Sequence, residues 1–327
     1  MKIIIAHQQI DPTDRPDDLD VLAQADLVQE ALTSLGHQVE ILPCTLNLEA
    51  LTRQLNVLQP DLVFNLVESL GGHDRLLHLF PWLLESLNLP YTGAPAQAIL
   101  TTTDKLTAKQ RLHQAGLPTP AWQTTQGPGS KHQAAPKQWL LKSVWEHASI
   151  GMDSTSLLSG VNNDELGVIL AQNTSRSGAT RFAEAFIPGR EFNLALLAAP
   201  GGPQVLHPAE ILFEDFGDRP HLVDYRAKWE PDSFEYQHTR RSFAFNMDDR
   251  KLLIELERLA RACWQLFGLR GYGRVDFRVD EQGQPWILEI NTNPCLSADA
   301  GFAAALEQNE ISRNSAIKRI INDALRA

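Results

Sequence analysis

The pattern of apolar and polar residues predicts a βαβαβ unit at the start of the chain. Residues 2–7 (KIIIAH) form a short, continuous apolar run, which is typical of a strand buried on both faces of a parallel sheet. The polar stretch after it, 8–20, contains two prolines and is expected to be a loop. Because further apolar runs alternate with segments of helical spacing, we expect a parallel sheet with crossover helices. Its other strands are predicted at 37–44 and 61–67, and its helices at 21–36 and 48–59.

Two changes of pattern farther along divide the chain into three regions. Helical spacing at 76–90 and 102–116 gives way to a polar stretch rich in Gly and Pro at 126–138, which is typical of a linker. After Phe182 the chain is rich in strand patterns, with one long helical segment at 248–268. We therefore expect an α/β and α+β multidomain protein, with an N-terminal α/β domain at 1–101, a central domain at 102–180 and a C-terminal domain at 181–327.

Charged residues alternate along two predicted strands near the end of the chain, 273–280 and 285–291, which a Gly-containing turn joins into a hairpin. If the polar faces of the two strands coincide, carboxylate and amide oxygens converge, and these are donors that Mg²⁺ prefers beside substrate phosphates. A solvent-exposed hairpin with a salt bridge is the alternative. Strict alternation puts Leu288 on the opposite face from Glu289. The polar faces are formed by Arg274, Asp276 and Arg278 on the first strand and by Glu289 and Asn291 on the second.

Three other features could contribute to a binding site. Lys142 lies in the otherwise apolar strand WLLKSV, where a buried ammonium group needs an anionic partner or a path to water. The loop of small residues after it, which includes Ser149 and Gly151, would let backbone N–H groups approach phosphates. Two glutamates, Glu184 and Glu191, flank a Pro-Gly turn and could bind a purine and a ribose. Each feature also fits an ordinary surface turn or hairpin.

Composition narrows the classes of protein to which the chain can belong. Its 327 residues, of which 43% are hydrophobic, are typical of a globular enzyme. Its formal charge of −11 argues against a protein that binds nucleic acid or an anionic membrane. Its three cysteines are scattered, which predicts a reducing compartment without disulfide bonds. The first apolar run is too short for a signal peptide, and no apolar stretch is long enough to span a membrane. We therefore expect a cytoplasmic protein.

The order of these features resembles that of the ATP-grasp ligases, and more closely that of the D-alanine–D-alanine ligase family. The resemblance covers nearly the whole chain, through VFNLVESLGGHD, YTGAP, TTDKLTAKQRLHQAGLP, PGREFNLALL, DYRAKW, GRVDFRVD and ILEINTNP. It implies an ATP-grasp fold preceded by a doubly wound parallel-sheet domain. It also implies an ATP-dependent carboxylate–amine ligase. In such enzymes the carboxylate forms an acyl phosphate with release of ADP, and an amine then displaces the phosphate.

The resemblance implies a role for each candidate residue. Asp276, Glu289 and Asn291 would hold two Mg²⁺ ions, with Mn²⁺ as the alternative. Arg274 would stabilise the oxyanion of the tetrahedral intermediate. The implied nucleotide site consists of Lys105 and Lys142 for the α- and β-phosphates, Ser149 and Gly151 in the loop, Lys228 for the γ-phosphate, Glu184 with the backbone at Phe186 and Ile187 for adenine, and Glu191 for the ribose.

The substrate end departs from the family's motifs. Two glycines and a glutamate that the family has near its N-terminus are missing, and Asp17, Asp18 or Asp20 could replace the glutamate. Glu68 and His73 stand where the family has a histidine and a glutamate, an exchange that could preserve an acid–base pair. We therefore expect a substrate site that differs from that of the family.

The acceptor side and the lid depart from the family as well. Cys295 follows Pro294, and Ala300 with Gly301 replaces a Ser-Leu pair, so we take Glu68, His73, Cys295 and Asp299 as candidate substrate residues. Nothing near Cys295 signals a lowered pKa, so we expect it to pack and not to act as a nucleophile. The family's serine and tyrosine that join loop and lid are replaced by Ala148 and Trp229, and we expect these two side chains to touch.

The sequence thus predicts a ligase that joins a small-molecule carboxylate to an amine, using ATP and Mg²⁺ and acting on a pair other than two D-alanines. The family analogy favours a homodimer. Three alternatives stay open: D-alanine–D-alanine ligase itself, an ATP-binding protein without turnover, and a phosphotransferase that stops at the phosphorylated product. Phosphate release with and without an added amine separates a ligase from a phosphotransferase, and a screen of amino acid pairs with mass detection of the product tests the use of D-alanine.

Overall fold

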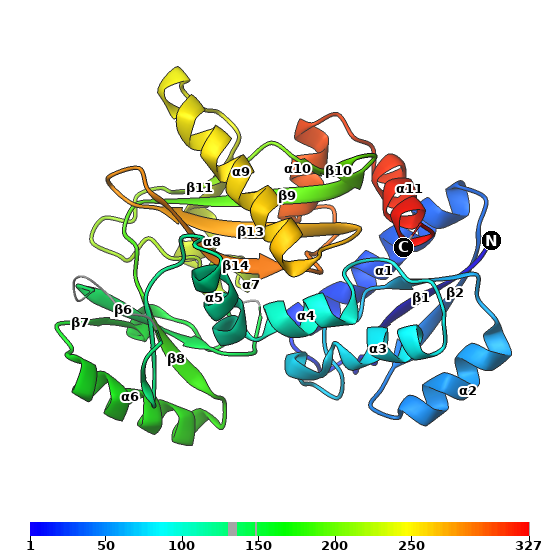
Figure 1. The fold of residues 1–327 in the computed structure, drawn as a ribbon, viewed down its shortest axis with the longest axis horizontal. Helices are drawn as coiled ribbons and strands as arrows, with labels where there is room; N and C mark the ends of the chain where they lie inside the picture. Colours follow the sequence, from blue (N-terminus) through cyan, green and yellow to red (C-terminus); the bar gives the residue numbers. More distant parts are fainter. Residues whose placement is uncertain (130–135, 148, 327) are drawn as a thin grey trace.

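The computed structural model describes residues 1–129, 136–147 and 149–326, and these residues form three β-sheets with helices around them (Figure 1). Strand β1 (Lys2–Gln8) lies in the centre of the first sheet, paired in parallel with β2 (Gln38–Cys44) and β3 (Leu62–Asn65). Helices α1 (Pro16–Ser34) and α2 (Leu48–Leu58) connect the strands. The predicted βαβαβ unit and its parallel pairing are confirmed.

Alternate residues of β1 pack against different helices, which makes this sheet doubly wound. Ile3 lies in one core with Val21 of α1, whereas Ile4 lies in a second core with Leu51 of α2. Both isoleucines are fully buried. Because successive strand side chains point to opposite faces, a sheet covered on both faces requires a continuous apolar run. The second core is completed by the helices η1 (Asp74–Leu76) and α3 (Leu79–Ser86).

Helix α1 begins earlier than predicted and shortens the expected loop at 8–20. Its first residue is Pro16, at a position where the missing N–H has no helical partner to lose. Asp17 and Asp18 follow in the first turn, where the helix dipole favours carboxylates. The apolar spacing only becomes helical at Val21, so spacing alone places the start too late. The earlier start brings the first-turn carboxylates to the cavity described below.

The second sheet has the strand order β5-β4-β8-β6-β7 and carries helix α6 (Asn163–Ser177) on one face. Strand β8 was expected in the third region, but it pairs with β4 and β6, so the chain leaves this sheet only after Ala185. An apolar strand fits either sheet by its own pattern. Within the predicted linker, residues 130–135 lie outside the described residues. The strands are β4 (Trp122–Thr124), β5 (Gly127–Pro128), β6 (Gln138–Ser143), β7 (Leu157–Ser159) and β8 (Arg181–Ala185).

The third sheet is antiparallel, with the order β12-β11-β9-β13-β14 and β10 beside β9. The long predicted helix is confirmed as α9 (Arg250–Phe267), which packs on this sheet through Leu256, Leu259 and Cys263 (Figure 1). The strands are β9 (Arg190–Ala199), β10 (Gly202–Val205), β11 (Ala209–Phe213), β12 (Thr239–Ser242), β13 (Tyr272–Val279) and β14 (Pro285–Asn291). The other helices are α4 (Ala96–Thr103), α5 (Lys105–Gln114), η2 (Ser154–Ser156), α7 (Tyr225–Trp229), α8 (Phe234–His238), η3 (Met247–Asp249), α10 (Gly301–Gln308) and α11 (Arg313–Ala324).

The first and last regions of the chain share one hydrophobic core. Ile3 and Val21 pack in it with Tyr272 of β13, Phe302 of α10 and Ile317 of α11. Helix α11 contacts both α1 and β9, and both chain ends lie on this side of the molecule (Figure 1). The N-terminal sheet is therefore held against the third sheet by apolar packing.

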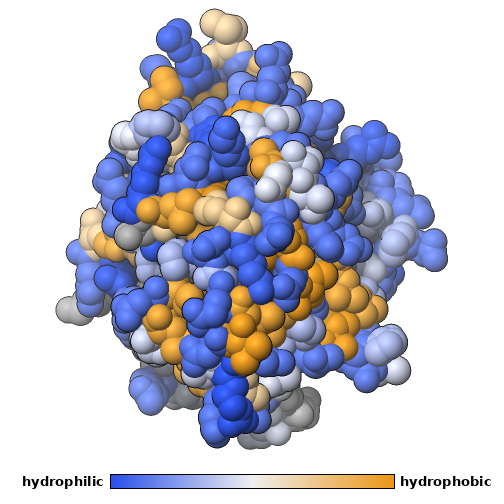
Figure 2. Space-filling model, turned by 90° about the vertical axis from the view of Figure 1, so that its right-hand side faces the viewer, coloured by the Kyte–Doolittle hydropathy of each residue, from blue (hydrophilic) through white to orange (hydrophobic). Residues whose placement is uncertain are grey.

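The face of the molecule at this end carries apolar patches among polar and charged groups (Figure 2). Strand β2 forms one edge of the N-terminal sheet, and its Ile41 is exposed. Pro43 offers no N–H along this edge, and Glu40 adds a charge, two features that disfavour pairing with a strand of another chain. Among the described helices, none combines the length and the apolar character that crossing a membrane requires.

Candidate active site

The hairpin of β13 and β14 presents one polar face. Asp276 lies opposite Glu289, and Arg274 lies opposite Asn291, so the four side chains share a side of the sheet, as the alternation predicts. On the other neighbouring strand, Asn193 of β9 pairs with Asp276 and donates a hydrogen bond of 2.9 Å to its carboxylate. Three antiparallel strands thus place two carboxylates and two amides side by side.

A bulge in β14 corrects the predicted position of Leu288. The register shifts after Asp276, so that Phe277 pairs with Ile287 and the partner strand holds one extra residue. Leu288 therefore lines the same cavity as Glu289, while Phe277 and Ile287 stay fully buried in the core. A bulge of this kind breaks strict alternation. The leucine side chain fits either face, so the sequence holds no signal for it.

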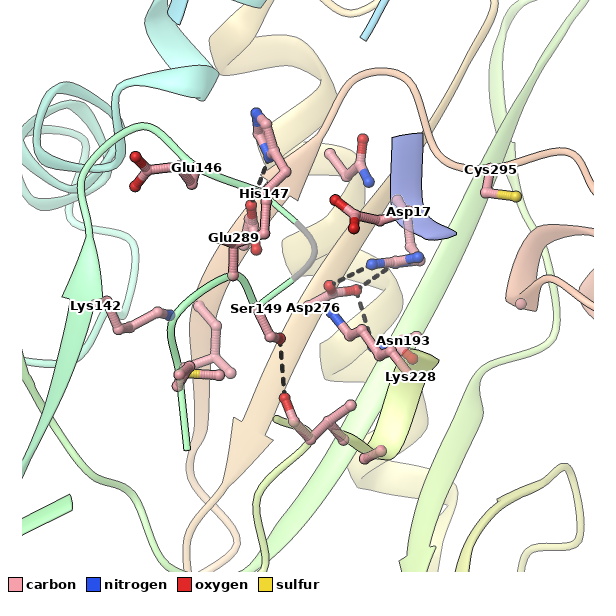
Figure 3. A pocket seen from close by; sticks show the side chains of 18 of the residues that line it. Asp17, Lys142, Glu146, His147, Ser149, Asn193, Lys228, Asp276, Glu289 and Cys295 are labelled. Carbon is pink, nitrogen blue, oxygen red and sulfur yellow. Dashed lines mark hydrogen bonds and ion pairs between the residues drawn. The ribbon is translucent and has the colours of Figure 1, made fainter. Parts of the chain in front are cut away.

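A cavity of about 580 Å³ lies where the three sheets meet (Figure 3). Its wall is formed by side chains from all three regions of the chain. Its volume is typical of ligand sites and leaves room for a nucleotide and small substrates together. The predicted residues that line it are Glu68, Lys105, Lys142, Ser149, Glu184, Phe186, Ile187, Glu191, Lys228, Arg274, Asp276, Glu289, Asn291, Cys295 and Asp299.

Two predicted residues, His73 and Gly151, do not line the cavity. His73 is exposed, and its neighbour Asp74 faces the cavity instead and accepts a hydrogen bond of 2.9 Å from the backbone of His147. Gly151 has a φ of +67°, and a Cβ there would lie 2.6 Å from the guanidinium of Arg181. The positive φ favours glycine at this position. The roles expected for both residues stay predictions.

A buried ion triad joins α5, β6 and β8 at the nucleotide end. Glu184 contacts Lys109 at 2.7 Å and Lys142 at 3.0 Å, and all three side chains are nearly or fully withdrawn from solvent. Burial alone raises the pKa of Glu184, but the two lysines lower it further than burial raises it, so the carboxylate is ionised. Burial lowers the pKa of Lys109, against the pull of Glu184. Lys142, which was predicted to need an anionic partner, thus has one in Glu184.

Sequence reasoning missed Lys109, although its spacing gives a signal. It lies four residues after Lys105, so both lysines occupy one face of α5. Lys109 is 1% exposed and also donates hydrogen bonds to Thr119 and to the carbonyl of Pro120. Two lysines at helical spacing in a segment that packs on a sheet indicate a second buried partner, here Glu184.

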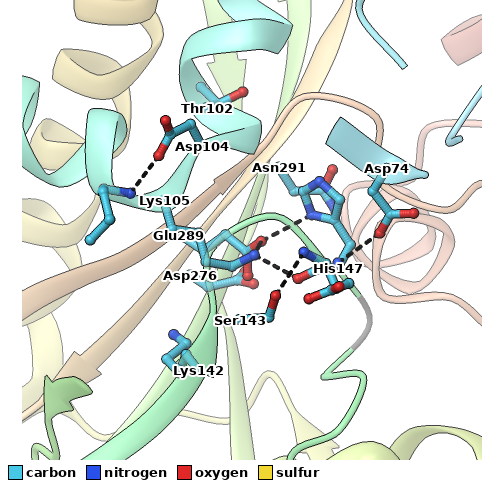
Figure 4. A network of polar contacts seen from close by, with 12 residues as sticks. Asp74, Thr102, Asp104, Lys105, Lys142, Ser143, His147, Asp276, Glu289 and Asn291 are labelled. Carbon is cyan, nitrogen blue, oxygen red and sulfur yellow. Dashed lines mark hydrogen bonds and ion pairs between the residues drawn. The ribbon is translucent and has the colours of Figure 1, made fainter. Parts of the chain in front are cut away.

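Glu289 is surrounded by cations and a histidine from the loop after β6 (Figure 4). Its Oε1 lies 3.7 Å from Nζ of Lys105 and 3.2 Å from Nδ1 of His147. Lys105 also donates a hydrogen bond of 2.7 Å to the carbonyl of Glu146. Burial raises the pKa of Glu289, but Lys105 and His147 lower it well below its usual value. The carboxylate is thus ionised and available to a cation.

Asp276 is held by both arms of one guanidinium group. The Nε and Nη2 atoms of Arg274 lie 2.7 and 2.8 Å from its two carboxylate oxygens. Burial lowers the pKa of Arg274, but Asp276 raises it above the usual range. The donors of this face are all hard oxygens on rigid strands, which fits Mg²⁺ and does not fit a soft metal. Asp276, Glu289 and Asn291 therefore suit the metal that the resemblance implies.

Glu191, expected near the ribose, is fixed by a second arginine that sequence reasoning had left without a role. Nη1 of Arg278 lies 3.0 Å from the carboxylate of Glu191 and 2.8 Å from the carbonyl of His221. The same guanidinium donates to the carbonyl of Ile187 and lies 5.1 Å from the ring centre of Phe186. Arg278 thus orients the predicted adenine and ribose residues together.

The loop after β6 is held against the segment before α7. Ser149 donates a hydrogen bond of 3.0 Å from its hydroxyl to the carbonyl of Val223 (Figure 3). The backbone of Tyr225 donates to the carbonyl of Met152, and its hydroxyl lies 2.9 Å from a carboxylate oxygen of Asp17 in α1. Polar contacts thus join the three regions at the mouth of the cavity.

Trp229 and Lys228 extend from α7 toward the cavity. The expected contact of Trp229 with Ala148 stays a prediction, because Ala148 lies outside the described residues. Lys228 is exposed to the space inside the cavity, yet protein surrounds its ammonium group. Burial, followed by the charge of Arg274, lowers its pKa, and Glu289 acts in the opposite direction. A lysine in such a position is ready for an anionic ligand.

The substrate end is built around Asp20. Its carboxylate accepts from the thiol of Cys295 at 2.9 Å, from the hydroxyl of Ser297 at 2.9 Å and from the amide of Gln24 at 3.1 Å. Gln24 also donates to Glu68 at 3.0 Å. Burial and then Asp20 raise the pKa of the Cys295 thiol, so it is a hydrogen-bond donor and not a nucleophile.

The chain is similar to known D-alanine–D-alanine ligases in sequence and in fold. Residues 112–322 match the model of the D-ala D-ala ligase C-terminus. The chain is 30% identical over 319 residues to a D-alanine–D-alanine ligase of Moorella thermoacetica, a match that covers 93% of this chain and 94% of the relative. It is 28% identical over 313 residues to one of a Synechococcus species, covering 91% and 86%.

The solved structures agree in fold. That of a D-alanine–D-alanine ligase from Bacillus anthracis, complexed with ATP, superposes with a TM-score of 0.72 at 19% identity and covers 100% of this chain and 98% of that one. At this identity the similarity shows the ATP-grasp fold alone. The family model and the 30% identical relative show more: the chain belongs to the D-alanine–D-alanine ligase family, ATP-dependent ligases that form C–N bonds.

Proposed function

We propose that the chain activates a small carboxylate substrate with ATP and joins it to an amine, with the individual residues in the roles that the family resemblance implies. The observation that supports this most strongly is the shared face of the hairpin. Its oxygen donors line the same cavity as three lysines that come from three different elements, α5, β6 and α7. Anionic donors for a cation and cationic donors for phosphates thus face one space, as phosphoryl transfer requires.

In this proposal the lysines bind the phosphates of ATP. Lys105 and Lys142 hold the α- and β-phosphates, and Lys228 lies at the γ-phosphate, where its ammonium group balances the charge of the transferred group. Asp276, Glu289 and Asn291 would hold two Mg²⁺ ions, which when bound neutralise phosphate charge. The carboxylate of the substrate attacks the γ-phosphorus and ADP leaves.

The second step is the attack of the amine on the acyl carbon. Negative charge develops on the acyl oxygen, and the guanidinium of Arg274 stabilises it without changing its own protonation. The attack forms the C–N bond, and when the tetrahedral intermediate collapses the C–O bond breaks, phosphate leaves and the nitrogen loses a proton to it or to solvent. The contacts from Ser149 and Tyr225 that close the mouth would keep water from the acyl phosphate.

We further propose that the substrates are not the two D-alanines in the names of the relatives. The support is the substrate end, where the family's hydroxyl-bearing pair is replaced by Ala300 and Gly301 and where Asp20 holds Cys295 and Ser297. These residues give that end a different arrangement of donors. Glu68, Cys295 and Asp299 line it, and His73 is not included.

The experiment that tests the function is a screen of amino acid pairs, in D and L forms, for phosphate release from ATP with mass detection of the product. The expected result is phosphate release that depends on an added amine, together with a new amide. Phosphate release with a phosphorylated carboxylate and no amide would indicate a phosphotransferase, and nucleotide binding without turnover would indicate a binding protein. Efficient formation of D-alanyl-D-alanine would overturn the substrate proposal alone.

Three further expectations stay predictions: the homodimer, the cytoplasmic location and the division into domains at 1–101, 102–180 and 181–327. Measurement of the molar mass in solution tests the first. Fractionation of cells that express the chain tests the second. Limited proteolysis, with mapping of the cleavage sites, tests the third.

A further inference from the structure

Carboxylates in the cavity fall into two groups according to their partners. Around the proposed nucleotide and metal positions, four of them have a cation within 4 Å: Glu184 has Lys109 and Lys142, Glu191 has Arg278, Asp276 has Arg274, and Glu289 has Lys105. These ion pairs leave little uncompensated negative charge there, as a site for anionic phosphates requires.

At the substrate end, by contrast, three carboxylates contact only neutral donors of the described chain. Asp20 accepts from a thiol, a hydroxyl and an amide, Glu68 from the amide of Gln24, and Asp74 from a backbone N–H. Two cations, Lys105 and Arg15, act on Asp74, but both do so from beyond ion-pair distance. A carboxylate withdrawn from water without a cation is costly, so a ligand that supplies one is favoured.

Asp20 and Glu68 form the centre of this group, because a single nitrogen, Nε2 of Gln24, donates to both. Two further carboxylates at this end, Asp17 and Asp18, already pair with Arg15 at 3.2 and 2.9 Å. That arginine therefore does not neutralise the centre.

The pKa of Glu68 also reflects the excess of carboxylates over cations at the substrate end. Burial raises the pKa of Glu68 to about 8, and the charges of Asp20, Asp74 and Asp18 add to this, against the hydrogen bond from Gln24. Like charges that raise the pKa of a carboxyl are not compensated by the protein. An amino acid with one ammonium group and one carboxylate has no net charge. It would therefore leave the negative charge of Asp20, Glu68 and Asp74 uncompensated.

We propose that the substrate end selects an amino acid with a second cationic group, a diamino acid of the lysine or ornithine kind, whose ammonium groups are received by Asp20 and Glu68. The inference rests on the proposed function, because it names the substrate class of the same site. It differs from the requirement of any amino acid ligase, since one ammonium group is common to all such substrates and the second is not.

The test compares each diamino acid with its counterpart that lacks only the second ammonium group. Lysine and norleucine form one pair, and ornithine and norvaline the other, each in D and L forms. Binding is measured by titration calorimetry on the full chain with Mg²⁺ and a non-hydrolysable ATP analogue, so that turnover is not needed. We expect at least one diamino acid to bind about tenfold or more tightly than its neutral counterpart, with a preference that weakens as salt is added.

Variants separate recognition of the second charge from a structural role. Glu68→Gln keeps an acceptor for Gln24, and Asp20→Asn keeps one for Ser297. The variant at the carboxylate that receives the second ammonium group is expected to reduce the binding of the diamino acid about tenfold while binding of the neutral counterpart changes little, and the other variant is expected to weaken both members of a pair. Asp26→Asn, on an exposed position of the same helix as Asp20, is the matched control and should change neither.

The inference is overturned if the neutral counterparts bind as tightly as both diamino acids, or if neither diamino acid binds at millimolar concentration. It is also overturned if both variants weaken the two members of a pair equally. The proposed function fails separately, if no pair of substrates yields an amide. Amide formation from neutral amino acids alone would retain the function and reject the diamino acid.

Discussion

At the scale of single residues, the two hairpin carboxylates lie opposite each other but have different partners. Asp276 is bound by both arms of Arg274, whereas Glu289 contacts Lys105 and His147. In each case a cation of the protein already sits beside the carboxylate. A metal ion must therefore share each carboxylate with the protein's own cation or displace that cation. The negative charge of the carboxylate is what allows the metal ion to compete with it.

The first prediction concerns these carboxylates. Asp276→Asn and Glu289→Gln each remove a charge at nearly constant shape, so amine-dependent phosphate release should fall by about two orders of magnitude or more. The fold should persist, as judged by circular dichroism. Glu281→Gln, in the exposed turn of the same hairpin, is the control and should keep full activity. Near-normal release by either site variant would show that the metal assignment is wrong.

A second prediction follows from the raised pKa of Glu68. Its carboxyl has a usual value of 4.5 and a value of about 8 in the folded chain, mainly because of burial. The folded state thus binds more protons than the unfolded state between these values, so Glu68 reduces stability as pH rises through this window. The free energy of unfolding of Glu68→Gln, relative to the parent chain, should rise from pH 5 to pH 8. Urea titrations at several pH values measure it, and a difference that does not vary with pH would contradict the prediction.

At the scale of elements, the sequence predicted what depends on local periodicity and missed what depends on distant pairing. The shared face of Asp276 and Glu289 follows from alternation along each strand. The bulge at Leu288 does not, because the residue suits either face. The pairing of β8 with the second sheet and the partner of Lys109 depend on segments far away in the chain, which no local pattern encodes.

The third prediction belongs to the elements that the ion triad joins. Lys109→Met keeps the length of the side chain but removes one of the two cations beside buried Glu184. Breaking a buried ion pair from one side costs about 3–5 kcal/mol, so the variant should unfold at a clearly lower urea concentration. Lys251→Met, on an exposed position of α9, should cost little. Equal stabilities of the two variants would argue that the triad does not stabilise the contact between α5 and the second sheet.

At the scale of the whole molecule, the three regions meet through Tyr225. Its hydroxyl contacts Asp17 of α1 and its backbone contacts Met152, so one short helix links the N-terminal sheet to the loop over the cavity. Sequence reasoning expected Trp229 to contact this loop at Ala148 and could not identify Tyr225, because its partner Asp17 lies in a segment predicted to be a loop.

The fourth prediction tests this link by a double-mutant cycle. Tyr225→Phe and Asp17→Ala should each raise the ratio of ATP hydrolysis without amine to amide formation, because each removes the hydrogen bond between the two side chains and the cavity opens more often. In the double variant the two effects should not add, since both remove the same hydrogen bond, and the coupling should be about 1 kcal/mol. Additive effects would mean that the two residues act independently.

The core shared by the two ends of the chain has a consequence for folding during translation. Among its elements β1 is synthesised first and α11 last, yet Ile3 and Ile317 belong to one apolar cluster. The N-terminal sheet therefore emerges with one face of α1 uncovered and stays so until translation of α11 is complete. Nascent domains usually fold in the order of their synthesis, but here the first domain has to wait for the last helix. During that interval the part of this apolar cluster that α11 covers in the folded chain stays exposed to solvent.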